Sequence, residues 1–131
     1  MSVSAYRRTL AETETPRDIE RRVLSRVTAE LLAIQPEFDP EESKATRLAI
    51  LNDKLREPLN NNLKIWATLK RDLIGPGNQL SEKVRADLIS LAIFVEHHTV
   101  EVLAGRGQVQ ALIDINKPII EGLSGVTAEK S

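Results

Sequence analysis

Apolar residues recur along this chain at the three- and four-residue spacing of helices, in four stretches separated by prolines, glycines and capping residues. No stretch alternates apolar and polar residues with the period of a strand over a useful length. The first predicted helix begins at Thr15 and Pro16, an N-cap hydroxyl followed by a proline at the first helical position. Pro36 is expected to end this helix close to Gln35. Its inward face is expected to be Ile19, Val23, Val27, Leu31 and Ile34.

The second predicted helix begins with the same signal, at Asp39 and Pro40, and stops at the Gly-Pro-Gly-Asn sequence of residues 75–78. Pro58 lies in its middle. A proline inside a helix removes one backbone hydrogen bond and crowds the preceding turn, so we expect a kink or a break near residues 56–60. The expected inward face is Leu48, Leu51, Leu55, Leu59, Leu63, Trp66, Ala67, Leu73 and Ile74.

The third predicted helix, Ser81 to Ala104, is separated from the fourth by Gly105-Arg106-Gly107, which supplies a left-handed C-cap and a tight connection. One face of the third helix is expected to hold Val84, Leu88, Leu91, Ala92, Val95, Val102 and Leu103. The fourth carries a narrow apolar stripe, interrupted only by the backbone effect of Pro118, that consists of Val109, Leu112, Ile113, Asn116, Ile119, Ile120 and Leu123.

These elements predict an all-α protein whose short connections between the later helices favour antiparallel neighbours. We expect a four-helix antiparallel bundle with a kinked or broken second helix, formed by residues 15–123 as a single domain. Residues 1–14 are expected to be flexible. Residues 124–131, which are small, polar or charged, are expected to form a disordered tail.

The third helix has more apolar surface than one face of a small bundle requires. Ile89 and Ile93 point almost opposite to its inward face, and Phe94 points to the side. Ile65 and Leu69 similarly lie off the inward face predicted for the second helix. Two interpretations stay open: the third helix is central and covered on both sides, or these five residues bind a partner. A homodimer would also cover them.

Length and composition limit the chain to one domain without thiol chemistry. With 131 residues it can bury about two-thirds of its unfolded surface, and the absence of cysteine excludes disulfides. Eighteen basic against nineteen acidic residues leave a net charge of −1, which provides no global attraction to nucleic acid or anionic lipid. The first eight residues lack an apolar signal core, and no apolar run reaches the ~20 residues of a membrane span. We expect a cytoplasmic protein.

Candidate catalytic and metal-binding residues are few. His97 and His98 are the only histidines, and adjacent helical positions point about 100° apart rather than at one ion. His98 continues the apolar face of the third helix, so we expect it to be partly buried at the edge of the bundle. Ser90 lies about two turns before His97 and lacks the strand–turn–helix context of a nucleophile. We therefore expect no metal, no cofactor and no enzymatic activity.

Four arginines of the first helix spread over the arc opposite its inward face and could contact RNA phosphates or a regulatory protein. They are Arg17, Arg21, Arg22 and Arg26. The aromatic content of 3% leaves few side chains for stacking on single-stranded bases, and the total charge is balanced. Direct nucleic-acid binding is therefore the weaker interpretation, because a basic strip on a helix is more often a solvated face.

Several stretches, in order along nearly the whole chain, resemble the FlaF family of flagellar biosynthesis regulators from alphaproteobacteria. The matching stretches are Ser4–Arg7, Thr15–Glu20, Val27–Thr28, Asn62–Trp66, Val84–Leu91 and Leu112–Asn116. The resemblance implies a small, helical, non-enzymatic protein that acts in flagellin production and export, together with flagellin and the translational regulator FlbT.

The resemblance does not say which residues contact flagellin. Flagellin's terminal segments form amphipathic helices that would aggregate if left exposed, and an apolar groove beside Ile89, Ile93 and Phe94 could cover one of them. We therefore expect an export chaperone that binds flagellin. The alternative is a post-transcriptional regulator that acts with FlbT on flagellin mRNA through the arginines of the first helix.

Overall fold

Helices are the only regular secondary structure in the part of the chain that the computed structural model describes, residues 16–75 and 80–129, with side chains over 18–75 and 80–122. The all-α prediction is therefore confirmed. Residues 1–14 lie outside the described part, and the disordered tail stays a prediction, although α6 extends beyond Leu123. The elements are α2 (Pro16–Phe38), α3 (Lys44–Ile50), the π-helical turn η1 (Leu51–Leu55), α4 (Arg56–Ile74), α5 (Glu82–Leu103) and α6 (Val109–Glu129).

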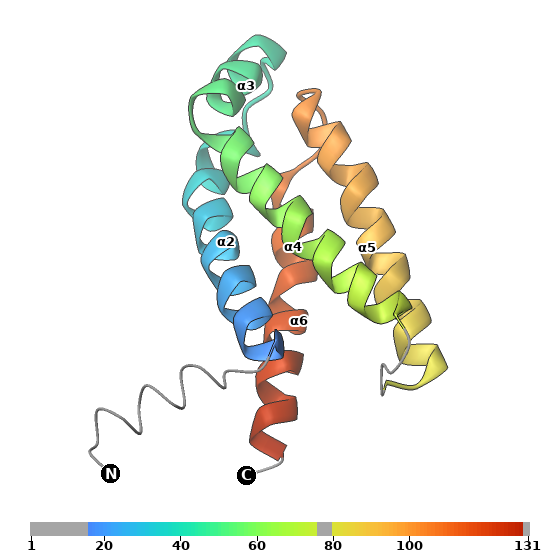
Figure 1. Ribbon diagram of the computed structural model, residues 1–131. Coiled ribbons are helices and arrows are strands. Elements are labelled where there is room, and N and C mark those ends of the chain that lie inside the picture. Colours follow the sequence, from blue (N-terminus) through green and yellow to red (C-terminus); the bar gives the residue numbers. More distant parts are fainter. Residues whose placement is uncertain (1–15, 76–79, 130–131) are drawn as a thin grey trace, which may run out of the picture.

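The helices form an antiparallel bundle in which α5 occupies an outer position (Figure 1). Helix α2 packs against both α6 and α4, and these three helices surround the main core. Helix α5 packs chiefly against α4 and much less against α6. The interpretation that the third helix is central, covered on both sides, is therefore wrong.

Helix α2 is longer than predicted, and its buried face differs in part from the expected one. It continues through Pro36 to Phe38, and the N–H of Asp39 donates to the carbonyl of Gln35 at 3.0 Å. A proline removes only one helical hydrogen bond, and the fully buried Phe38 holds the last turn in the core. Leu24 and Phe38 are fully buried on the inward face of α2. Ile19, which was expected on that face, is exposed.

The second helix does not begin at Asp39 and Pro40. Helix α3 begins at Lys44, and its N-cap is Ser43, whose hydroxyl accepts from the N–H of Thr46 at 3.3 Å. The buried Asp39 carboxylate instead accepts from the N–H groups of Val109 and Gln110, at 2.7 and 2.9 Å. These N–H groups lie in the first turn of α6, where no helical carbonyl is available to them. Asp39 is thus the cap of the last helix.

The predicted disturbance around Pro58 is confirmed, but it lies just before residues 56–60. Residues Leu51–Leu55 form a π-helical turn, in which the N–H of Arg56 bonds to the carbonyl of Leu51. Each π turn adds a residue, so the positions that follow are rotated relative to a continuous α-helix. Ala67 and Ile74 are exposed although they were expected to point inward, because the buried face of α4 passes through Trp66, Leu69 and Leu73.

A buried polar network joins the three central helices. The side-chain amide of Asn116 on α6 donates to the hydroxyl of Thr28 on α2 at 3.0 Å and to Oδ1 of Asn62 on α4 at 2.8 Å. Its carbonyl oxygen accepts from the indole N–H of Trp66 at 2.8 Å. All four side chains are at most 4% exposed, and the hydroxyl of Thr28 also donates to the carbonyl of Leu24. Such a network fixes the register of α2, α4 and α6.

Helix α5 begins and ends close to the residues predicted from the sequence. Ser81 is its N-cap, accepting from the N–H of Val84 at 3.3 Å, and the helix ends at Leu103 before Gly105, which has the left-handed φ of 81°. Val84 is exposed, against expectation, because the last turns of α4 and the first turns of α5 lie to one side, away from α2 and α6 (Figure 1). Helix α6 continues through Pro118.

Candidate partner-binding site

The face of α5 that points away from the core carries an apolar strip. Ile93 is 40% exposed, Val100 is 60% exposed and Ile89 is half-buried. The spacings of four and seven residues place these three side chains on one side of the helix, and we call them the outer strip. The opposite side of α5 is buried through Ala92, Val95, Thr99 and Val102. The helix is therefore apolar on two sides, and only one of them is fully buried.

Phe94 lies on the adjoining flank of α5 and is held in place by His98. Its ring is 45% exposed and stacks on the imidazole with centroids 5.3 Å apart and an angle of 11° between the planes. Nε2 of His98 lies 2.8 Å from the carbonyl oxygen of Gln108, in the connection to α6. The expectation of a partly buried histidine at the edge of the bundle is confirmed. Phe94 thus offers a fixed aromatic surface to solvent.

Polar pairs lie around this apolar surface. Lys70 on α4 and Glu96 on α5 form an ion pair of 2.9 Å. Glu101 pairs with Arg106 at 2.8 Å, and the hydrogen bond from Arg106 lowers the pKa of the Glu101 carboxyl below its ordinary value. An apolar centre with a polar rim is the usual composition of a protein–protein contact surface. This arrangement can bind another apolar helix face.

Of the five residues predicted to bind a partner, three lie on the exposed side of α5 and two do not lie at the surface. Ile65 and Leu69 are only 8% and 9% exposed and belong to the core, so their predicted position off the inward face is wrong. Leu69 lies three residues after Trp66 and four before Leu73, and Ile65 precedes Trp66, so both belong to the buried face of α4. Val100 was not identified, although its position seven residues after Ile93 was a sufficient signal.

The arginines of the first helix are only partly placed by the structure. Arg22 and Arg26 are exposed on α2 and Arg21 is half-buried, whereas the side chain of Arg17 lies outside the described residues.

Within the described part of the chain, no three His, Cys, Asp or Glu side chains are grouped so that they could hold a metal ion. None of the described helices is both long and apolar enough to cross a membrane.

Comparison with known protein families shows what this chain is similar to. The family model described as flagellar protein FlaF matches residues 2–123, which is nearly the whole chain. No curated protein and no solved structure matches.

Proposed function

We propose a function from the premise that this chain belongs to the FlaF family of flagellar proteins, as the match over residues 2–123 shows. The protein acts as a flagellar biosynthesis regulator that binds flagellin in the cytoplasm and covers one of its amphipathic terminal helices before export. The observation that carries this proposal is the outer strip of α5, an apolar helix face that stays partly exposed to solvent.

The shape of the outer strip suits a helical partner. Recognition of an amphipathic helix uses apolar anchors at spacings of three, four and seven residues, which is how Ile89, Ile93 and Val100 follow one another. A flagellin helix laid beside α5 would bury these side chains and the exposed part of Phe94. It would thereby remove from water the apolar surface of both partners.

The proposal is tested by placing a carboxylate in the outer strip. Ile93→Glu should weaken the binding of flagellin roughly tenfold or more, because a buried charge without a partner opposes apolar contact. Asn60→Glu is the matched control, since Asn60 is exposed on α4 and does not belong to the strip. Binding is measured by calorimetry with full-length flagellin and with flagellin truncated at either end. An Ile93→Glu protein that is folded and binds as the unsubstituted chain does would reject the proposal.

Salt dependence distinguishes this proposal from regulation through FlbT and flagellin mRNA. Contact between apolar helix faces persists as ionic strength rises, whereas contacts between arginines and phosphates weaken steeply. A flagellin complex that survives high salt supports the chaperone role. A second copy of this chain on the outer strip would instead be detected by sedimentation as a homodimer that Ile93→Glu dissociates.

A further inference from the structure

One ionisable side chain lies between members of the outer strip. His97 is exposed on α5, four residues after Ile93 and three before Val100. Residues at these spacings are neighbours on one side of a helix, so the imidazole lies between two apolar side chains. A partner helix that covered Ile93 and Val100 would therefore cover His97 as well.

The two histidines of α5 differ in their contacts. His98 stacks on the ring of Phe94, and its Nε2 lies 2.8 Å from the carbonyl oxygen of Gln108. Among the residues whose side chains are described, none forms a hydrogen bond, an ion pair or a ring contact with His97. Both ring nitrogens of His97 are therefore available to a partner.

The carboxylates nearest to His97 along α5 are already paired. Glu96, the preceding residue, pairs with Lys70 at 2.9 Å. Glu101, one helical turn further on, pairs with Arg106 at 2.8 Å. These pairs leave the imidazole without an acceptor from its own helix.

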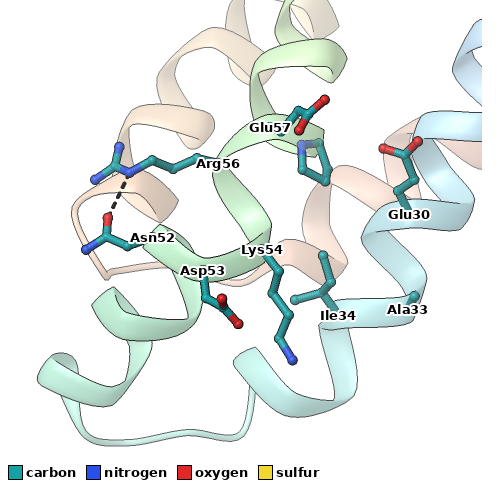
Figure 2. Close-up of a pocket in the computed structure, with 9 residues that line it drawn as sticks. Glu30, Ala33, Ile34, Asn52, Asp53, Lys54, Arg56 and Glu57 are labelled. Carbon is teal, nitrogen blue, oxygen red and sulfur yellow. Dashed lines mark hydrogen bonds between the residues drawn. The ribbon is translucent and has the colours of Figure 1, made fainter.

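Basic side chains in the cleft between α2 and the start of α4 are in the opposite situation. This cleft has a volume of about 570 Å³, and Nε of Arg56 on its wall donates to Oδ1 of Asn52 at 2.9 Å (Figure 2). Lys54, which also lines the cleft, pairs with Glu37. The bases of the cleft thus have acceptors within the chain, whereas His97 has none among the described side chains.

We infer, on the basis of the proposed function, that His97 is a specificity-determining residue of the flagellin-binding surface and donates a hydrogen bond to a carboxylate of the partner helix. An imidazole that is covered without a hydrogen-bond partner weakens binding, because it loses water and gains no bond in return. The backbone N–H and C=O groups within a helix are bonded to one another, so the acceptor is a side chain. A carboxylate accepts from neutral and protonated histidine alike, and its bond to the protonated form is charge-assisted.

The consequence is a selection among amphipathic helices. A helix with Asp or Glu opposite His97 satisfies the imidazole, whereas a helix that is apolar at that position leaves it unpaired. The surface therefore discriminates between partners through the cost of an unpaired polar group, in addition to the apolar area that they bury.

Three substitutions of His97 test this inference by calorimetric titration with full-length flagellin. His97→Leu should weaken binding roughly tenfold, because the carboxylate of the partner loses its donor. For a histidine that only contacts solvent, the added apolar surface of leucine would strengthen binding instead. His97→Arg keeps a cationic donor and should bind at least as tightly as the unsubstituted chain, and His97→Gln, a neutral donor, should bind roughly threefold more weakly.

Asn60→Leu is the matched control, since it adds the same apolar side chain at an exposed position of α4 outside the strip. It should leave the affinity for flagellin unchanged. His97 is exposed, so its variants should fold as the unsubstituted chain does, which circular dichroism checks.

Two outcomes would overturn the inference and leave the proposed function intact. The first is binding by His97→Leu that is unchanged or tighter, and the second is an affinity of His97→Arg no higher than that of His97→Gln, while Ile93→Glu still weakens binding in both cases. If flagellin does not bind the unsubstituted chain, or binds Ile93→Glu equally well, the proposed function is rejected and this inference with it.

Discussion

Helices α6 and α5 are held in the same bundle by different kinds of contact. Helix α6 is fixed by polar contacts with the rest of the bundle, through Asn116 in the central network and through the cap that Asp39 provides. In α5 the buried hydroxyl of Thr99 donates only to the carbonyl of Val95 in its own helix. The polar contacts of α5 with α4, the Lys70–Glu96 pair and the bond from Arg85 to the carbonyl of Leu73, are only partly buried. Directional polar contacts therefore define the position of α6, and α5 retains a partly exposed apolar face.

The strongest test of this difference removes the centre of the polar network. Asn116→Ala should lower the free energy of unfolding by about 3 kcal/mol, because Trp66, Thr28 and Asn62 each lose a buried partner. Urea denaturation followed by circular dichroism measures the loss. Asn60→Ala, at an exposed position of α4, serves as the control and should change stability little. A loss for Asn116→Ala no greater than the control's would contradict the role of the network.

Removing the cap of α6 should have a smaller effect. Asp39→Ala deprives the N–H groups of Val109 and Gln110 of their acceptors and should cost about 1 to 2 kcal/mol. Asp39→Asn keeps one acceptor oxygen and should lose less. Hydrogen exchange at the two amides is the direct measurement, and protection unchanged by Asp39→Ala would show that α6 does not depend on this contact.

A charged substitution in the outer strip should lower the free energy of unfolding less than the same substitution in the core. Ile93→Glu is expected to alter the free energy of unfolding by no more than about 0.5 kcal/mol, because the side chain is already partly in water. Ile65→Glu, at a residue that the sequence grouped with Ile93, should prevent folding, since it places a charge in the core. Thermal denaturation compares the two variants. Equal destabilisation would mean that α5 is not an outer element.

The smallest expected effect concerns pH at the end of α5. The hydrogen bond from Arg106 lowers the pKa of Glu101 from its ordinary 4.5. Its contribution to stability is therefore fully present above the unfolded pKa and is lost as pH falls through the lower folded value. Glu101→Gln should weaken the dependence of stability on pH in the acidic range below 4.5 and leave it unchanged near neutrality. Urea denaturation at several pH values measures the free energy of unfolding. If its dependence on pH below 4.5 is the same in Glu101→Gln, the Glu101–Arg106 pair does not contribute to stability.

The candidate site could be predicted from the sequence only in part. The apolar surplus of α5 follows from helical periodicity, so Ile89, Ile93 and Phe94 were identified, and Val100 was identifiable by the same rule. Ile65 and Leu69 were placed wrongly, although the spacing within α4 was a sufficient signal for Leu69, which follows Trp66 by three residues and precedes Leu73 by four. The sequence around Pro58 indicates a disturbance but does not give its form, which is a π turn over Leu51–Leu55.

The sequence by itself determined the helical class, the capped ends of α5 and the apolar residues that exceed one inward face. These follow from signals a few residues long, such as Ser81 before the helix and the left-handed Gly105 after it. Only the tertiary structure decided that Asp39 caps α6, that Phe38 carries α2 past Pro36, and that Asn116 joins α2 to α4. Each of these depends on the three-dimensional packing of residues distant in sequence, and local spacing does not specify which distant groups will meet.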